Sequence, residues 1–201
     1  DLHSFPTRRS SDLWSSAAPL IERVDTVPMR DVEVEGLVFR ESFSVVAIEA
    51  GIATNTVPDR CKLTVNYRFA PDLSAEQALD RALRILAGQD AKVGATAAVG
   101  EAPPVIAAGV GMVDVYIDDL CEAARPGLDS PLAVELLAAV RTRGGGVGPK
   151  YGWTDVARFS AAGIPAVNLG PGDPMLCHTD DEHCPVAQIQ AVTEILREWL
   201  M

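Results

Sequence analysis

The sequence of 201 residues contains no apolar run long enough to cross a membrane. It also shows no basic start followed by an apolar core, the pattern typical of a secretory signal peptide. Basic side chains are few, since 17 lysines and arginines stand against 28 aspartates and glutamates, for a net charge of −11. An acidic surface disfavours nucleic acids and anionic membranes as partners. We therefore expect a cytoplasmic protein that binds neither nucleic acid nor membrane.

Cysteine is also scarce, and no two of the four cysteines form a C-x-x-C pair. Neither a zinc knuckle nor a redox pair is therefore indicated, and we expect reduced thiols that pack as small hydrophobic residues, without disulfides. The sequence has no serine nucleophile turn, phosphate-binding loop or dinucleotide fingerprint. Serine hydrolases and nucleotide-binding enzymes are thus not indicated.

The first stretch, residues 1–13 (DLHSFPTRRSSDL), has neither helical nor strand periodicity. It resembles the translated sequencing adapter found at the ends of environmental gene fragments. We exclude it from the fold as a non-native segment. We expect the rest, from residue 14 onward, to be a fragment of a longer protein.

Residues 14–125 carry the pattern of a small α+β domain. The capping box of Ser74 and Gln77, an apolar stripe and a final Gly88 make its central helix the clearest element. The expected elements are the end of a helix (14–27), a connector or edge strand (32–39), strands (44–52 and 61–69), a helix (74–87) and a strand (112–120). This order predicts the later part of a ferredoxin-like β-α-β-β-α-β fold that lacks its first strand.

Residues 126–201 alternate helix and strand, as one edge of an α/β sheet does. Ser130 and Pro131 begin the first helix of this part. The expected elements are a linker (126–129), helices (130–143 and 154–161), a buried strand (164–169) and a final helix (185–200) with Val186, Ile189, Val192, Leu196 and Leu200 inward. This part is too small to cover both faces of such a sheet by itself.

His178 is the strongest candidate for chemistry. It lies in the acidic loop GPGDPMLCHTDDEH, which follows the expected strand 164–169. We interpret it as a neutral imidazole ligand, oriented through its second ring nitrogen by a nearby carboxylate, or else as a surface histidine. A zinc site needs three or four protein ligands, and one histidine cannot supply them. A mononuclear site of Cys177, His178, His183 and Cys184 is a further hypothesis, which the crowded spacing disfavours.

Two other pairs could bind a carboxylate. Thr154 and Asp155 begin a short helix, where free N–H groups and the threonine hydroxyl could meet a substrate, unless they form an ordinary N-cap. Asn55 lies in a turn and Arg68 on the polar face of a strand. An amide and a guanidinium suit a carboxylate ligand, while the alternatives are a turn asparagine and a solvated arginine.

Three segments together carry a family resemblance: residues 55–78 (NTVPDRCKLTVNYRFAPDLSAEQA), 124–131 (ARPGLDSP) and 150–186 (KYGWTDVARFSAAGIPAVNLGPGDPMLCHTDDEHCPV). They resemble the succinyl-diaminopimelate desuccinylases, the actinobacterial ones in particular, within the wider family of di-zinc aminoacylases and carboxypeptidases. The resemblance implies a catalytic α/β domain interrupted by a β-α-β-β-α-β lid that forms a homodimer. Residues 14–125 would be this lid, and residues 126–201 the C-terminal part of a metallopeptidase catalytic domain.

The resemblance also implies an activity. Two zinc ions per subunit, with cobalt as an alternative, would serve hydrolysis of N-succinyl-LL-2,6-diaminopimelate to succinate and LL-2,6-diaminopimelate, a step of lysine and peptidoglycan precursor biosynthesis. The implied roles are His178 as a metal ligand, Asn55, Arg68, Thr154 and Asp155 as contacts to the N-acyl amino acid, and Glu182 as support for the ligand loop. The family's other metal ligands and its glutamate base match no residue of this sequence, so we expect this chain alone to be inactive.

Two alternatives to this function stay open. The parent protein could be another acyl-amino-acid hydrolase or carboxypeptidase of the same family, and the chain could be a non-catalytic dimerisation module. In either case a missing lid strand would expose a sheet edge and leave apolar faces uncovered. We therefore expect the chain to be poorly stable by itself.

Overall fold

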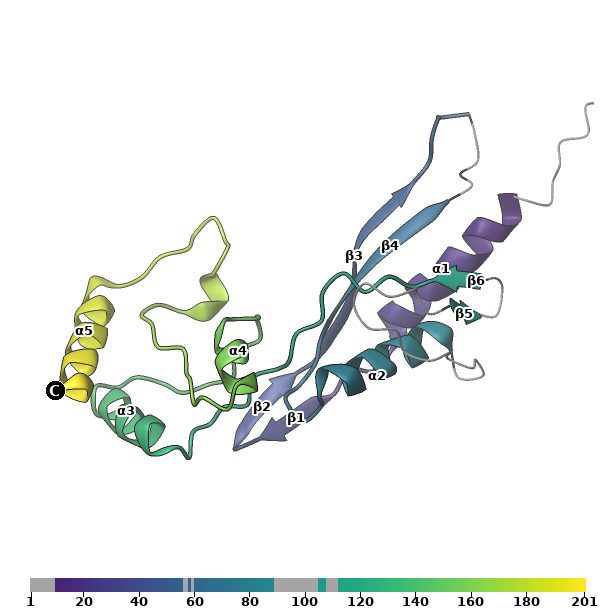
Figure 1. The fold of residues 1–201 in the computed structure, drawn as a ribbon. Helices are drawn as coiled ribbons and strands as arrows, with labels where there is room; N and C mark the ends of the chain where they lie inside the picture. The colour runs from purple at the N-terminus through teal and green to yellow at the C-terminus, as the bar shows by residue number, and fades with distance from the viewer. Residues whose placement is uncertain (1–9, 56–57, 59, 89–104, 108–111) are drawn as a thin grey trace, which may run out of the picture. The chain divides into compact units, whose positions relative to one another are not determined.

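The computed structural model describes residues 10–55, 58, 60–88, 105–107 and 112–201 (Figure 1). The described residues fall into two compact units, the first within residues 1–32 and 40–123 and the second within 33–39 and 124–201. Most of the stretch 1–13 and of the Ala/Gly/Val-rich segment 88–111 lies outside the described residues. No helix within the described ranges is long and apolar enough to span a bilayer.

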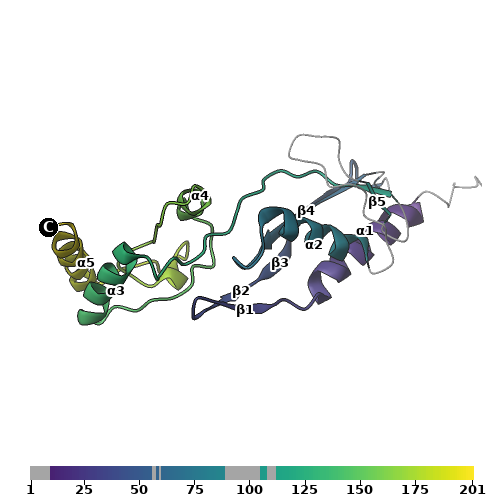
Figure 2. The same ribbon diagram turned by 60° about the horizontal axis from the view of Figure 1, so that its bottom comes forward.

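The first unit is built on an antiparallel ribbon of β3 (Ser42–Ala50) and β4 (Cys61–Arg68) (Figures 1 and 2). The register pairs Ser42 with Arg68, and a bulge shifts it between Val45 and Ala47. Side chains of β4 alternate between half-buried positions, such as Tyr67, and exposed ones, such as Arg68. Thr64 departs from this alternation because it is also half-buried, and Arg68 lies on the exposed face as predicted.

Helix α1 (Ser10–Thr26) packs against this ribbon and against α2 (Ala75–Ala87). Its buried side chains, Ala17, Leu20 and Val24, recur at the three- and four-residue spacing of one helix face. The helix begins at Ser10, inside the stretch that the sequence analysis set aside. Residues 10–13, which belong to that stretch, and residues 14–26 therefore form one continuous helix.

Both ends of α2 are closed by specific hydrogen bonds. Gln77 N–H donates to the Ser74 hydroxyl at 3.2 Å, and Ser74 N–H donates to the Gln77 side chain at 2.9 Å, which confirms the predicted capping box. The Glu122 carboxylate accepts from Ala75 N–H at 2.9 Å. At the other end Gly88 has φ +85°, and Arg23 donates to the carbonyl of Leu86 at 2.6 Å.

The remaining strands form two further hairpins. β1 (Asp31–Val34) and β2 (Leu37–Arg40) pair where a connector or a single edge strand was expected. The pairing is possible because Glu35 and Gly36 both take positive φ, as a two-residue hairpin turn requires. β5 (Val105–Ala107) pairs with β6 (Met112–Asp114), which ends well before residue 120.

Helices and strands are both present, as predicted, but the expected ferredoxin-like sheet is not observed among the described residues. The strands there form three separate two-stranded sheets, β1–β2, β3–β4 and β5–β6. Each strand pairs with its neighbour along the chain, and short loops make such pairings the least costly in entropy. The described residues thus have a mixed α and β fold, and they do not confirm the predicted topology.

The second unit contains α3 (Pro131–Thr142), α4 (Val156–Ala161), the short 3₁₀ helix η1 (Pro174–Leu176) and α5 (Val186–Leu200). Ser130 caps α3 as predicted, since its hydroxyl accepts from Ala133 N–H at 3.3 Å. Helices α3 and α5 form a small core of Leu136, Val140 and Ile195, with Ala139, Leu169 and Trp199 packed around it. An ion pair of 2.6 Å between Arg143 and Glu198 closes the end of this helix pair.

Two predictions for this unit are wrong. Residues 164–169 form no strand, and no strand lies anywhere within residues 124–201, so this part of the unit offers them no strand to pair with. The inward face of α5 is centred on Ile195; of the five residues predicted to face inward, Val192 is half-buried and the other four, Val186, Ile189, Leu196 and Leu200, are exposed. Helical periodicity predicted an apolar stripe, but the packing of α3 selected a different one.

Candidate functional site

The loop between η1 and α5 carries His178 and is held by its own hydrogen bonds. Gly172 N–H donates to the side-chain oxygen of Gln188, on α5, at 2.7 Å. Asp173 caps η1 by accepting from Met175 N–H at 2.9 Å. Thr179 donates to the carbonyl of Leu176 through its N–H at 3.1 Å and its hydroxyl at 2.8 Å. The loop is thus a series of linked turns.

His178 lies at the exposed tip of this loop and has φ +65°. Its backbone N–H donates to Glu182 Oε2 at 3.0 Å. The predicted support of the loop by Glu182 therefore has a geometric basis, but it acts on the main chain. The expected bond from a carboxylate to the second ring nitrogen is not found, since the imidazole has no hydrogen-bond partner within the part of the chain that the structure describes.

The described residues contain no group of three or more His, Cys, Asp or Glu side chains that could hold a metal ion. The His183 ring nitrogen Nδ1 lies 2.6 Å from the carbonyl of Asp181, and the Cys184 thiol donates to the carbonyl of Pro185 at 3.5 Å. None of the four cysteines forms a disulfide within the described residues, and the four-residue cysteine and histidine site does not form there. These residues do not fit a zinc or cobalt centre by themselves, because a single histidine ligand is too few.

Thr154 and Asp155 lie at the start of α4, as predicted, but Asp155 makes no capping hydrogen bond. Asp155 faces Arg158 at 3.9 Å, and the Arg158 guanidinium lies 5.3 Å from the centre of the Trp153 ring. The Thr154 hydroxyl accepts from the side-chain amide of Asn168 at 3.0 Å. Asn168 was missed by the sequence analysis, which placed it in a strand that does not form.

Asn55 and Arg68 lie at opposite ends of β4. Asn55 is in the turn that precedes the strand, and Arg68 is the exposed last residue of the strand. At about 3.4 Å per residue, β4 spans roughly 24 Å from Cys61 to Arg68, and Asn55 lies six residues before Cys61. The two side chains therefore cannot bind the same carboxylate within one chain.

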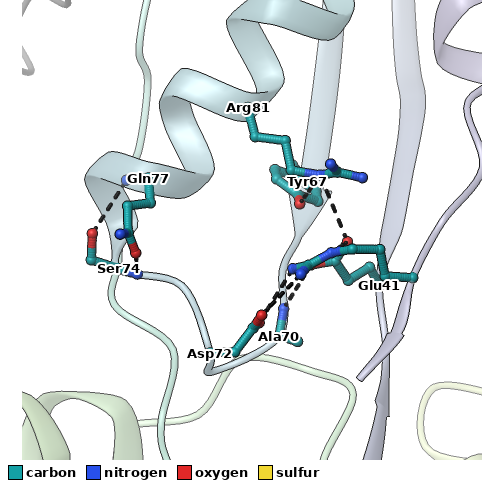
Figure 3. Close-up of polar contacts among 8 residues, drawn as sticks. Glu41, Tyr67, Ala70, Asp72, Ser74, Gln77 and Arg81 are labelled. Atoms are coloured by element: carbon teal, nitrogen blue, oxygen red, sulfur yellow. Dashed lines mark hydrogen bonds and ion pairs between the residues drawn. The ribbon is translucent and has the colours of Figure 1, made fainter. Parts of the chain in front are cut away.

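The structure also reveals a buried polar cluster that the sequence analysis missed (Figure 3). The Glu41 side chain is fully buried and accepts two hydrogen bonds from Arg30 and one, at 3.3 Å, from Ala70 N–H. Arg30 also binds Asp72 with contacts of 2.9 and 3.2 Å. Arg81 lies 3.9 Å from the Glu41 carboxylate. Glu41 thus joins the β2–β3 junction to the segment after β4.

This cluster shifts the pKa values of Arg30 and Tyr67, and it holds one end of β4 in place. Hydrogen bonds from Arg30 to Glu41, and then to Asp72, raise the pKa of Arg30 above its ordinary value. Burial, and then the charge of Glu41, raises the pKa of Tyr67, whose hydroxyl accepts from Arg81 at 3.1 Å. Because Tyr67 precedes Arg68, the cluster holds the strand end that carries Arg68. Nothing in the sequence marks Glu41 as buried, since its partners come from three separate segments.

Comparison with known proteins shows what the chain is similar to. Residues 15–93 match the model of the peptidase dimerisation domain. The chain is 41% identical, over 181 residues, to the putative succinyl-diaminopimelate desuccinylase of Mycobacterium tuberculosis, in strains CDC 1551 and H37Rv alike. This match covers 90% of the chain and 44% of the relative.

A second relative agrees with the first. The succinyl-diaminopimelate desuccinylase of Corynebacterium glutamicum is 33% identical over 200 residues, which is 98% of the chain and 48% of that relative. The chain spans about half the length of the curated relatives it matches. The chain is therefore similar to succinyl-diaminopimelate desuccinylases over about half of their length, and its residues 15–93 match a peptidase dimerisation domain.

Proposed function

We propose that the chain supplies the dimerising lid and the C-terminal catalytic segment of a cytoplasmic, zinc-dependent succinyl-diaminopimelate desuccinylase. The reaction would release succinate and LL-2,6-diaminopimelate from their N-succinyl conjugate, within lysine and peptidoglycan precursor biosynthesis. The observation that carries this proposal is the 41% identity over 181 residues to a protein of that name. The dimerisation-domain match over residues 15–93 supports a homodimer.

In this proposal the two ends of β4 serve different carboxylates. The N-succinyl substrate carries carboxylates on its succinyl arm and on its diaminopimelate part, far enough apart for separate recognition. Arg68 would bind one of them by a charge-assisted hydrogen bond, and Asn55 would bind another through its amide. The strand β4, roughly 24 Å long, lies between them, so the two residues would serve the sites of different subunits of a dimer and not one shared subsite.

Thr154 and Asp155 would line the substrate pocket. The Asn168 amide donates to the Thr154 hydroxyl, so this hydroxyl keeps its own proton available for a second hydrogen bond. A hydroxyl in that state is a donor, which suits a substrate carboxylate or carbonyl oxygen. Arg158 draws the Asp155 carboxylate toward itself, so that Asp155 would border the pocket and Thr154 would contact the substrate.

His178 would be one ligand of a metal centre, and the described residues form no group of three or more side chains that could complete it. Because one histidine does not hold zinc at useful affinity, we assign no metal-dependent step to the chain by itself. The chain alone is expected to be inactive. Its contribution would be an exposed imidazole on a loop that Glu182 supports.

The test is a complementation assay with two polypeptides. The 201-residue chain is co-expressed with the part of the M. tuberculosis relative that its match does not cover, and hydrolysis of N-succinyl-LL-2,6-diaminopimelate is measured with added zinc. We expect activity from the pair and none from either part alone. His178→Ala should abolish the activity, while His183→Ala, a change of the other histidine in the same loop, should retain it. A folded but inactive pair, or an active His178→Ala pair, would contradict the proposal.

Two alternatives have their own outcomes in this assay. A pair that cleaves N-acetyl amino acids or dipeptides but not the succinyl substrate would be another hydrolase of the family. A chain that is dimeric by light scattering, yet supports no hydrolysis of any substrate in the pair, would be a dimerisation module. The absence of a metal-ligand group among the described residues is the observation that favours this second alternative.

A further inference from the structure

The backbone of His178 takes a conformation that side chains with a Cβ atom rarely adopt. Its φ of +65° lies in the left-handed region, which glycine occupies freely and other residues avoid for steric reasons. Glu35 is the one other non-glycine residue in the described part of the chain with positive φ. A histidine that is kept in this region at an exposed loop tip must be held there by its surroundings.

Glu182 supplies the restraint. Its carboxylate reaches back to accept the His178 N–H at 3.0 Å, and an ionised acceptor makes this a charge-assisted bond. Glu182 is itself fixed, because its own N–H donates to the carbonyl of Thr179 at 3.1 Å. Thr179 is in turn bonded twice to Leu176. Residues 176–182 are therefore linked by a closed series of hydrogen bonds, in which the Glu182 carboxylate is the acceptor of the His178 amide.

The loop is also attached to helix α5. The Gly172 N–H bond to Gln188 ties the start of the loop to α5. The His178 ring takes no part in any of these bonds within the described residues, so both of its nitrogens remain available to a ligand. The main chain carries the restraint, and the imidazole is left free.

We propose that Glu182 is a positioning residue that fixes the main chain of His178 in the left-handed conformation, so that the imidazole is already presented outward in the ligand-free chain. The loop is then organised before any metal or partner arrives, and binding need not order it. The importance of this imidazole rests on the proposed function, whereas its conformation does not.

The experiment measures the main chain of His178 directly, in the ¹⁵N-labelled 201-residue chain with EDTA present. Amide hydrogen exchange reports the hydrogen bond, and the coupling between the amide and α protons reports φ. We expect Glu182→Ala to speed exchange of the His178 amide by about tenfold, as loss of a charge-assisted bond implies, and to move the coupling toward an averaged value. Glu182→Gln keeps an acceptor oxygen and should restore most of the protection.

Two further variants separate positioning from general effects. Asp180→Ala removes the same charge from the same exposed loop without removing a bond to His178, and it should leave the His178 amide unchanged. In a His178→Gly background the left-handed conformation has no steric cost, so Glu182→Ala should disturb neighbouring amides less than it does with histidine present. The amides of α3 and α5 report whether a variant stays folded.

The proposal is overturned if Glu182→Ala leaves exchange at His178 unchanged, if Glu182→Gln fails to restore protection, or if Asp180→Ala has the same effect as Glu182→Ala. The complementation assay distinguishes this inference from the proposed function. If Glu182→Ala changes the spectra as expected but the paired enzyme does not need His178, the conformational role stands and the catalytic assignment of His178 fails.

Discussion

Glu41 offers the sharpest test of how the first unit is held together. Glu41→Ala would remove a fully buried carboxylate that accepts hydrogen bonds from Arg30 and from Ala70 N–H (Figure 3). Arg30 would keep Asp72 as a partner, while Arg81 would lose its nearest carboxylate. The variant thus leaves two cations facing a cavity where one anion had stood.

The expected loss of stability in Glu41→Ala depends on how exposed Arg30 and Arg81 are. Removing one member of a buried ion pair costs about 3–5 kcal/mol, because the other member is left desolvated. Arg30 and Arg81 are 33% and 34% exposed, so water can solvate them in part, and we expect the lower end, about 3 kcal/mol. Glu41→Gln keeps the shape and one acceptor and should cost about 1.5 kcal/mol.

Urea unfolding monitored by circular dichroism measures this cost. With a slope of about 2 kcal/mol per molar, Glu41→Ala should lower the urea midpoint by roughly 1.5 M. The matched control is Glu49→Ala, whose carboxylate pairs with Lys62 at 3.2 Å but is 66% exposed, and it should cost less than about 0.5 kcal/mol. If Glu41→Ala and Glu49→Ala shift the midpoint equally, burial of this cluster does not stabilise the unit.

Three further predictions concern single positions. The folded-state pKa of Tyr67 is raised, so the neutral phenol stabilises the folded state fully below the unfolded pKa of about 10, and this stabilisation is lost as pH rises through the folded pKa. The free energy of unfolding should therefore fall above pH ~10, and it should fall less in Tyr67→Phe. Tyr116→Phe changes an exposed tyrosine and should leave that alkaline decline intact. Gly88→Ala would place a Cβ 3.1 Å from Arg23 Cζ at φ +85°, and should lower the stability of unit 1 by about 1 kcal/mol or more in thermal melts; an unchanged melting temperature would contradict this. Ser130→Ala should cost about 1 kcal/mol through loss of the α3 cap, whereas Ser130→Asp, which keeps an acceptor, should cost little.

The elements that could be predicted are those whose determinants lie within a few residues of one another. The capping box of Ser74 and Gln77 spans three residues, and the cap of α3 by Ser130 is equally local. Alternation along β4 shows which of its faces is buried. Such features depend on backbone groups that stay close along the chain, so pattern alone identifies them.

The elements that could not be predicted depend on partners far away in sequence. Residues 164–169 have the composition of a buried strand, but a strand needs a hydrogen-bonding neighbour, and no other strand lies within residues 124–201. The inward face of α5 depends on α3, which covers Ile195. The burial of Glu41 depends on three segments that meet only after folding.

The residues of the candidate site could likewise be predicted from the sequence, whereas their contacts could not. By itself the sequence determined which side chains are candidates, from His178 in its acidic loop to Arg68 on the polar face of its strand, because residue type and spacing set what each can bind. The tertiary structure decided how they are used: it placed Asn55 and Arg68 at opposite ends of β4, joined Thr154 to Asn168, and bound Glu182 to the main chain of His178. The physical reason is that a hydrogen bond depends on distances of a few ångströms between particular atoms, and only the folded chain fixes those distances.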